Sequence, residues 1–204
     1  MTDKRITPSS VQRAESRRNQ VLEAAQVCFR RSGFRGASMS EISALAGMST
    51  GHIYHYFKCK ESIVQAIVER DLQQGLAYIQ AIKEEDDIVQ ALIDAAADCI
   101  IDRNRKSEPA LHVEILAEAS RNPMILTIMN DCKTAVRRSL LDALESGRAR
   151  GAIAIDADIE AACTMLMLIF DGITIQSTLN PQFQREVIMQ QLGLLLNRVL
   201  RKAI

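Results

Sequence analysis

A short stretch near the N-terminus concentrates side chains that can contact a nucleic acid. Residues 38–57 read SMSEISALAGMSTGHIYHYF, with hydroxyls, imidazoles and phenols gathered in the second half. Hydroxyls and ring nitrogens hydrogen-bond to phosphate oxygens and base edges, and glycine permits a close approach of the backbone. The positions expected to face such a partner are Thr50, Gly51, His52, Tyr54, His55 and Tyr56.

Two short helices are needed to present these side chains. Ser38 followed by Glu41 has the spacing of a capping box, which starts a helix, and Gly47 ends that helix. Ser49 is placed to cap a second helix, expected over residues 50–57. A longer helix precedes this pair and ends at Gly33, and its apolar stripe is Val21, Leu22, Ala25, Cys28 and Phe29. This arrangement is typical of a helix-turn-helix, which places its second helix in the major groove of DNA.

The same segment resembles the DNA-binding signature of the TetR family of repressors. The resemblance covers roughly residues 15–70 and is carried by Phe29, Gly33, Phe34 and the run Ala46-Gly47-Met48-Ser49-x-Gly51-x-Ile53-Tyr54-His55-Tyr56-Phe57-x-x-Lys60-Glu61. His52 departs from the family, which often has a small or short polar residue there. Cys59 also departs, because a Ser, Thr or Asp more typically caps the following helix.

The resemblance implies roles for specific positions of the motif. Thr50 and Gly51 are expected to face bases, and Lys60 is expected to clamp a phosphate with the help of the positive end of its helix. Groove or phosphate contacts are expected from Ser38, Ser40, Ser49, His52, Tyr54, His55 and Tyr56. The alternatives are that Tyr56 and Phe57 belong to the core and that Ser38 is only a helix cap.

The charge distribution agrees with a polyanionic partner at one end of the chain. Residues 1–60 carry ten lysines and arginines against four acidic residues, a net formal charge of +6, and residues 61–204 carry a net of −6. Chance clustering on a solvated surface is the alternative. Segment 1–14 is expected to be a basic arm, 15–75 a DNA-binding domain with its helix-turn-helix at 38–57, and 76–204 a second domain.

The whole chain is predicted to be all-α, with about nine helices. Apolar residues recur at helical spacing throughout, and strand-like alternation is absent from the sequence. The second domain is expected to bind a ligand and to form a homodimer through its last two helices, over about 157–178 and 182–202, which are apolar almost all round. A monomer core is the alternative. The expected interface residues are Cys163, Leu166, Phe170, Ile188, Leu192, Leu195 and Val199.

A small-molecule pocket is expected inside the second domain, because its helices are rich in methionine and poor in large aromatic residues. Buried carboxylates there would need a partner, which favours an organic cation or a neutral drug-like molecule. Solvent exposure of Glu114 and Glu118, with Asp171 bonded in the dimer, is the alternative. The expected lining is His112, Glu114, Met129, Cys132, Met167, Phe170 and Asp171.

A helical enzyme is the competing class. Two of the three histidines lie in the expected recognition helix, and the sequence has no phosphate-binding loop or nucleophile elbow, so an enzyme, a metal site and a cofactor are not expected. The five cysteines are widely spaced without a C-x-x-C pair, which favours reduced thiols in a cytoplasm over disulfides or zinc. Neither a signal peptide nor a membrane span is expected, because the apolar runs are short.

Overall fold

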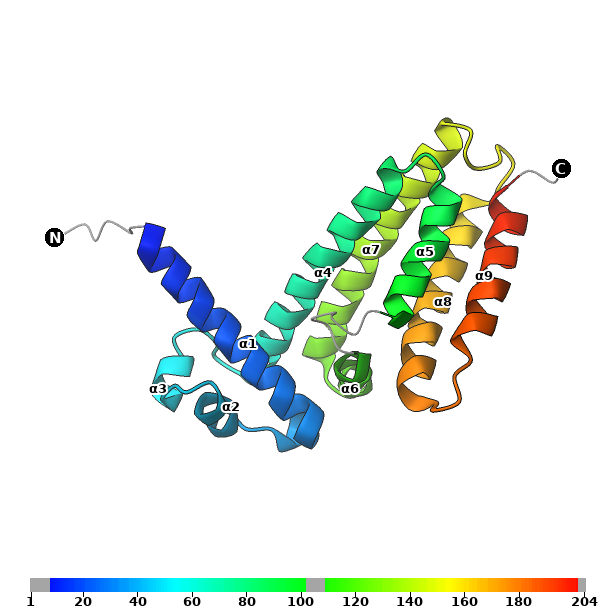
Figure 1. Ribbon diagram of the computed structural model, residues 1–204. Coiled ribbons are helices and arrows are strands. Elements are labelled where there is room, and N and C mark those ends of the chain that lie inside the picture. Colours follow the sequence, from blue (N-terminus) through cyan, green and yellow to red (C-terminus); the bar gives the residue numbers. More distant parts are fainter. Residues whose placement is uncertain (1–7, 102–108, 202–204) are drawn as a thin grey trace. The chain divides into compact units, whose positions relative to one another are not determined.

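The computed structural model describes residues 8–101 and 109–201, and all regular secondary structure in these ranges is α-helical (Figure 1). Nine helices follow one another along the described chain, which confirms the fold class expected from the sequence. They are α1 Pro8–Gly36, α2 Met39–Leu45, α3 Thr50–Ile53, α4 Lys60–Glu84, α5 Ile88–Ile101, α6 Pro109–Ala119, α7 Pro123–Ala149, α8 Ile159–Leu179 and α9 Arg185–Leu200.

The contacts within the chain define two compact units. The first unit contains the described residues of Met1–Val68 and Glu114–Ile128, and the second contains those of Glu69–Val113 and Met129–Ile204. Helices α4, α6 and α7 therefore contribute residues to both units. The domain boundary expected after residue 75 falls inside α4.

The first unit is built on α1, whose predicted apolar stripe is buried as expected. Gly33 breaks the helical geometry with a φ of 70°, a left-handed conformation that glycine adopts without steric strain. Residues 8–14, expected as part of a basic arm, form the first turns of α1, and residues 1–7 lie outside the described range. The expected second short helix is also shorter than residues 50–57, since α3 ends at Ile53.

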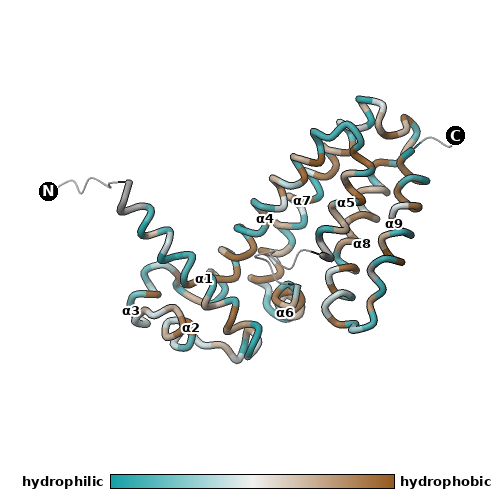
Figure 2. The backbone as a smooth tube through the Cα atoms, viewed as in Figure 1, coloured by the Kyte–Doolittle hydropathy of each residue, from teal (hydrophilic) through white to brown (hydrophobic). Residues whose placement is uncertain are grey.

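The second unit has a core of aliphatic side chains in which α5 packs on both α8 and α9. Figure 2 shows the hydrophobic residues that recur along α5 and α8. Gly147 lies buried inside α7. A Cβ atom there would come within 2.8 Å of Ile88 Cγ2, so the glycine permits a close approach of side chains to the helix.

Helix α8 is long and apolar enough to cross a membrane by length and composition alone. The core helix of a soluble protein passes the same test. One side of α8 is buried in the core of the second unit, through Ile159, Ala162, Cys163, Leu166 and Ile173. That packing gives the hydrophobicity of α8 a structural reason.

Candidate DNA-binding interface

Local hydrogen bonds fix the beginnings of α2 and α3. The Ser38 side chain accepts from Glu41 N at 3.1 Å, and Glu41 Oε2 accepts from Ser38 N at 3.0 Å, which is the capping box that the sequence predicted. Ser49 Oγ accepts from His52 N at 3.2 Å and so caps α3, also as predicted. Gly47 turns the chain between the two helices with a φ of 62°.

Buried polar contacts tie α2 to α3 and to α1. Ser43 is only 3% exposed, and its hydroxyl lies 3.0 Å from the Thr50 hydroxyl while donating to Ser40 O at 2.8 Å. Gln20 of α1 donates from Nε2 to Ala46 O, the C-cap of α2, at 2.8 Å. Sequence reasoning missed the contacts of Ser43 with Thr50 and of Gln20 with Ala46, because only the packing of the helices brings these residues close. The Thr50 hydroxyl, expected at a base, is held by Ser43.

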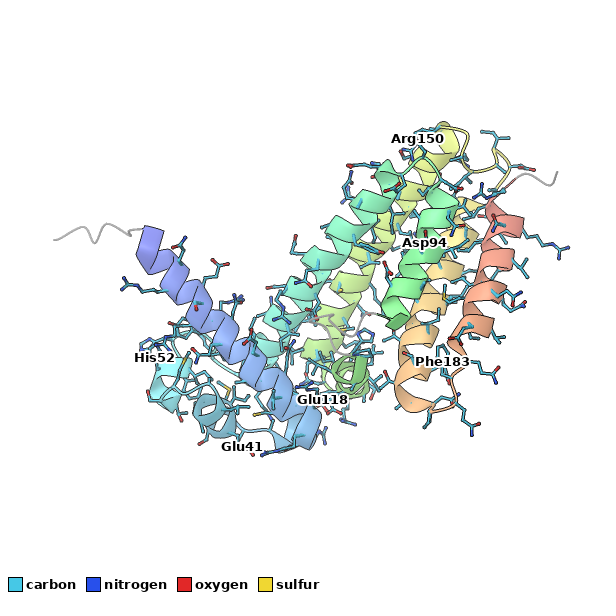
Figure 3. The ribbon with its side chains drawn as sticks, viewed as in Figure 1. Glu41, His52, Asp94, Glu118, Arg150 and Phe183 are labelled. Atoms are coloured by element: carbon cyan, nitrogen blue, oxygen red, sulfur yellow. The ribbon has the colours of Figure 1, made fainter. Side chains whose placement is uncertain are left out.

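The remaining motif residues form an accessible surface around α3. Ser38, Ser40, Ser49, Gly51, His52, Tyr54 and His55 are exposed, Tyr56 is half-buried, and Phe57 is buried in the core. The His52 ring stacks on Tyr56, with centroids 5.5 Å apart and an interplanar angle of 12°, and meets His55 edge-on. Figure 3 labels His52 on this helix. We call α2, α3 and their connecting turn the reading head.

The ammonium group of Lys60, expected to clamp a phosphate, is instead hydrogen-bonded within the protein. It donates to Phe34 O at 2.5 Å and to Ala37 O at 2.7 Å, and it lies over the Phe34 ring, 4.7 Å from the centroid. A cation at these carbonyls satisfies groups that the end of α1 leaves without helical partners. This geometry favours a positioning role for Lys60 over a contact with phosphate.

The helix α4 that Lys60 starts has an unusual cap. Cys59 precedes the helix and has no oxygen to cap it, but Ser62 Oγ accepts from Cys59 N at 3.4 Å and donates to Cys59 O at 2.8 Å. This is the return half of a capping box. It compensates in part for the departure of Cys59 from the family pattern.

The sequence predicted that Glu114 and Glu118 either line a pocket or face solvent. In this structure neither expectation holds. Both belong to the first unit: Glu114 Oε1 accepts from Phe34 N at 2.7 Å, and Glu118, 3% exposed, accepts from Arg121 Nε at 2.6 Å. The assignment of Glu114 to a ligand pocket is therefore corrected. No sequence signal links residues 34 and 114, which are 80 positions apart.

Three other expected pocket residues do come together in the second unit. Asp171 Oδ2 accepts from Lys133 Nζ at 3.0 Å. Burial lowers the pKa of His112, against an opposing effect of Asp171, and burial also raises the pKa of the Cys132 thiol. The charges of Asp71, Lys133 and Asp171 act on both His112 and Cys132, so these residues from α4, α6, α7 and α8 form one polar cluster.

The other expected lining residues are apolar and packed. Met129 is buried, while Met167 and Phe170 lie half-buried against the core. Two hollows of about 500 Å³ and 510 Å³ lie elsewhere on the second unit, one around the connection after α7 and one between α4 and α5. Figure 3 labels Arg150 and Asp94, which line them.

The expected dimer residues divide into two groups. Cys163, Leu166 and Leu192 are at most 4% exposed and belong to the core of the chain itself, so their assignment to an interface is corrected. Phe170 is half-buried against the same core. Ile188, Leu195 and Val199 are exposed. Further apolar residues of α8 and α9 that were not among the expected interface residues are also exposed, namely Met165, Leu168, Leu179, Val187 and Leu194.

A capped helix-turn-helix followed by a larger helical body defines a class of protein, the helix-turn-helix transcriptional regulators. Comparison with known sequences gives the family. Residues 21–67 match the family described as "Bacterial regulatory proteins, tetR family", and residues 85–201 match "BetI-type transcriptional repressor, C-terminal". The chain belongs to the TetR family, as the resemblance of its motif indicated, and is a transcriptional regulator of the repressor type and not an enzyme.

Individual relatives agree with this placement. The HTH-type transcriptional regulator UidR of Escherichia coli is 29% identical over 160 residues, which cover 76% of this chain and 78% of the relative. The structure of Salmonella enterica GusR superposes with a TM-score of 0.82 and 27% identity, over 98% of this chain and 100% of that one. A regulator from Saccharomonospora viridis, solved in complex with choline, shares the fold at a TM-score of 0.76 and 19% identity, over 93% and 100% of the two chains.

Proposed function

We propose that this protein is a ligand-responsive repressor that works in the cytoplasm. It binds a roughly palindromic DNA operator as a homodimer, and a small molecule bound in the second unit releases it. The observation that carries the proposal is the reading head: His52 on α3, and Tyr54 and His55 in the turn that directly follows it, are exposed, and hydrogen bonds fix the start and the packing of α3. Preorganised donors on an accessible helix are what groove recognition requires.

DNA binding is tested with a duplex from upstream of the gene for this protein and with a scrambled duplex of equal length. We expect a specific shift that weakens with salt, with a slope of about −0.9 in log K against log salt for each phosphate neutralised. Equal affinity for both duplexes would contradict a sequence-specific function. His52→Ala should reduce the preference for the specific duplex, because this exposed ring is placed to meet the groove.

A homodimer is proposed because one short recognition helix contacts too few base pairs to select a genomic site. Two copies would reach successive major grooves, about 34–36 Å apart or a multiple of that distance. Leu168 of α8 and Leu194 of α9 are 60% and 61% exposed in the single chain, and covering such side chains is favourable. A bundle of α8 and α9 from two chains would bury them.

Sedimentation of Leu168→Glu and Leu194→Glu variants tests this interface. We expect a folded monomer with strongly reduced operator affinity. The matched control is Leu126→Glu, an exposed leucine of the first unit, which should stay dimeric. A wild-type monomer that binds the operator tightly would overturn the dimer proposal. Leu166 is unsuitable for such a test because it is fully buried in the core.

The effector is proposed to contact the cluster around His112, and we expect an amphipathic organic cation or a neutral drug-like molecule. The cluster holds two carboxylates that a cation could approach: Asp171, which pairs with Lys133 at 3.0 Å, and Asp71, which pairs with Arg70 at 3.2 Å. Burial lowers the pKa of His112, so a cationic ligand does not compete with a charged imidazole there. The choline bound by the S. viridis relative supports a cationic ligand. Coupling of roughly 1–3 kcal/mol between the two sites would change operator affinity 5–150-fold.

Thermal unfolding is measured with a panel of cationic, neutral and anionic amphiphiles that includes choline, and operator release is measured for each ligand that stabilises the protein. Asp171→Asn should weaken the binding of cations more than the binding of neutral molecules. Stabilisation and release by anions alone would contradict the charge argument. If nothing in the panel binds, the sensor proposal fails while the DNA-binding proposal stands.

A further inference from the structure

The turn between α1 and α2 is held by side chains from distant parts of the first unit. We define the α1–α2 turn as residues 33–38. Within it, both backbone polar groups of Phe34 are hydrogen-bonded to side chains: its N–H donates to Glu114 Oε1 at 2.7 Å, and its carbonyl accepts from Lys60 Nζ at 2.5 Å. Lys60 starts α4 and Glu114 lies in α6, so neither residue belongs to the reading head.

The backbone around Gly33 is shaped to receive Glu114. A Cβ atom on Gly33 would lie 3.0 Å from Glu114 Oε1, closer than carbon and oxygen tolerate without movement. The φ of 70° at the same residue also favours glycine. Both the left-handed turn and the close approach of the Glu114 carboxylate therefore require that residue 33 has no side chain.

A second carboxylate of α6 reaches the next residue of the turn. Glu118 lies four residues after Glu114, so both share one face of the helix. Glu118 Oε2 lies 3.5 Å from Arg35 Nε and 2.6 Å from Arg121 Nε, and its carboxylate is almost fully buried. Figure 3 labels Glu118 on α6. The two carboxylates bind consecutive residues of the turn, Phe34 through its backbone and Arg35 through its side chain.

The turn leads directly into the N-cap of α2. Ser38 ends the turn and begins the capping box of the reading head, and Ala37 N donates to Gly33 O at 3.1 Å. The direction in which α2 leaves α1 is thus set by backbone groups that Glu114 and Lys60 hold. A hydrogen bond from a backbone N–H to a carboxylate is stronger than one to a neutral acceptor.

We propose that Glu114 is a positioning residue for DNA recognition, which it controls from α6 by fixing the α1–α2 turn. The inference rests on the proposed DNA-binding function. Loss of the contact lowers the fraction of molecules with a competent head, and the apparent affinity falls by the same factor.

The experiment compares Glu114→Ala, Glu114→Gln and the matched control Glu61→Ala. Glu61 also accepts one side-chain hydrogen bond within the first unit, from Asn122 Nδ2 at 3.2 Å, but its partner is remote in sequence from the turn. Affinity is measured for a duplex that the wild-type protein selects from a random library and for random-sequence DNA, together with the unfolding midpoint of each variant.

Glu114→Ala should lose roughly tenfold in affinity for the selected duplex, with little change for random DNA, as expected from the loss of one hydrogen bond to a charged acceptor. Glu114→Gln should recover most of that affinity, because its amide oxygen still accepts from Phe34 N. Glu61→Ala should lower the midpoint without changing the ratio of the two affinities. Wild-type discrimination in Glu114→Ala, or an equal loss in Glu61→Ala, would overturn the inference.

Two further outcomes are decisive. If the wild-type protein selects no duplex, the proposed function fails and this inference fails with it; if the wild-type protein selects one and Glu114→Ala binds it equally well, only the inference fails. If Glu114→Ala does not fold, amide exchange in the wild-type protein replaces it. The Phe34 amide should be protected, and exchange at the rate of an unstructured peptide would refute the contact.

Discussion

Replacing Lys60 by alanine separates two roles for this residue. In the structure the ammonium group bonds two carbonyls at the end of α1 and covers the Phe34 ring. A hydrogen bond to a charged group contributes roughly 1.5–3 kcal/mol, and a cation at a helix C-terminus about 0.3–1 kcal/mol. Lys60 is half-exposed, so water replaces part of this interaction. We therefore expect Lys60→Ala to reduce the free energy of unfolding by about 1–3 kcal/mol.

For a chain of this length, that loss lowers the thermal midpoint by roughly 2–12 °C. The assay is thermal unfolding by circular dichroism, combined with DNA affinity between low and moderate salt. Because the ammonium is engaged inside the protein, the slope of log K against log salt should change little. Lys58→Ala is the control, an exposed lysine two positions away whose loss should leave the midpoint unchanged. An unchanged midpoint in Lys60→Ala with a slope flattened by about 0.9 per phosphate would refute the positioning role and restore the phosphate clamp.

Three further predictions follow from the second unit. The folded state keeps the pKa of His112 below the ordinary value of 6.5, so the unfolded chain takes up a proton that the folded chain does not as the pH falls through about 6.5. The free energy of unfolding should therefore decline from about pH 7.5 to 5.5. His112→Gln should flatten that decline, as measured by urea titrations. Gly147→Ala should destabilise by about 0.5–2 kcal/mol, because its Cβ would meet Ile88 at 2.8 Å, whereas Gly75→Ala, in open space within α4, should stabilise by about 0.5–1 kcal/mol; a stabilised Gly147→Ala would contradict the packing. Burial raises the pKa of Cys132, so its thiol should react slowly with iodoacetamide at pH 7.5 in the folded protein and rapidly after unfolding, as read by mass spectrometry.

Much of the reading head could be predicted because its determinants are local in sequence. The capping box of Ser38 and Glu41, the cap at Ser49 and the turn at Gly47 each involve residues at most three positions apart, and the structure contains all of them. Local hydrogen bonds of this kind depend on side-chain type and spacing, which the sequence states directly. The family motif adds only the functional meaning of the exposed positions.

The sequence alone therefore determined the all-α class, the caps of α2 and α3 and the family of this protein, while the tertiary structure decided which faces and partners each helix uses. An almost wholly apolar helix such as α8 has no polar face to orient it, so periodicity could not tell buried Leu166 from exposed Leu168. Lys60 and Glu114 could not be placed either, because they meet Phe34 across 26 and 80 residues. Such contacts arise only when packed helices bring distant groups within hydrogen-bonding distance, which is a property of the fold and not of any one segment.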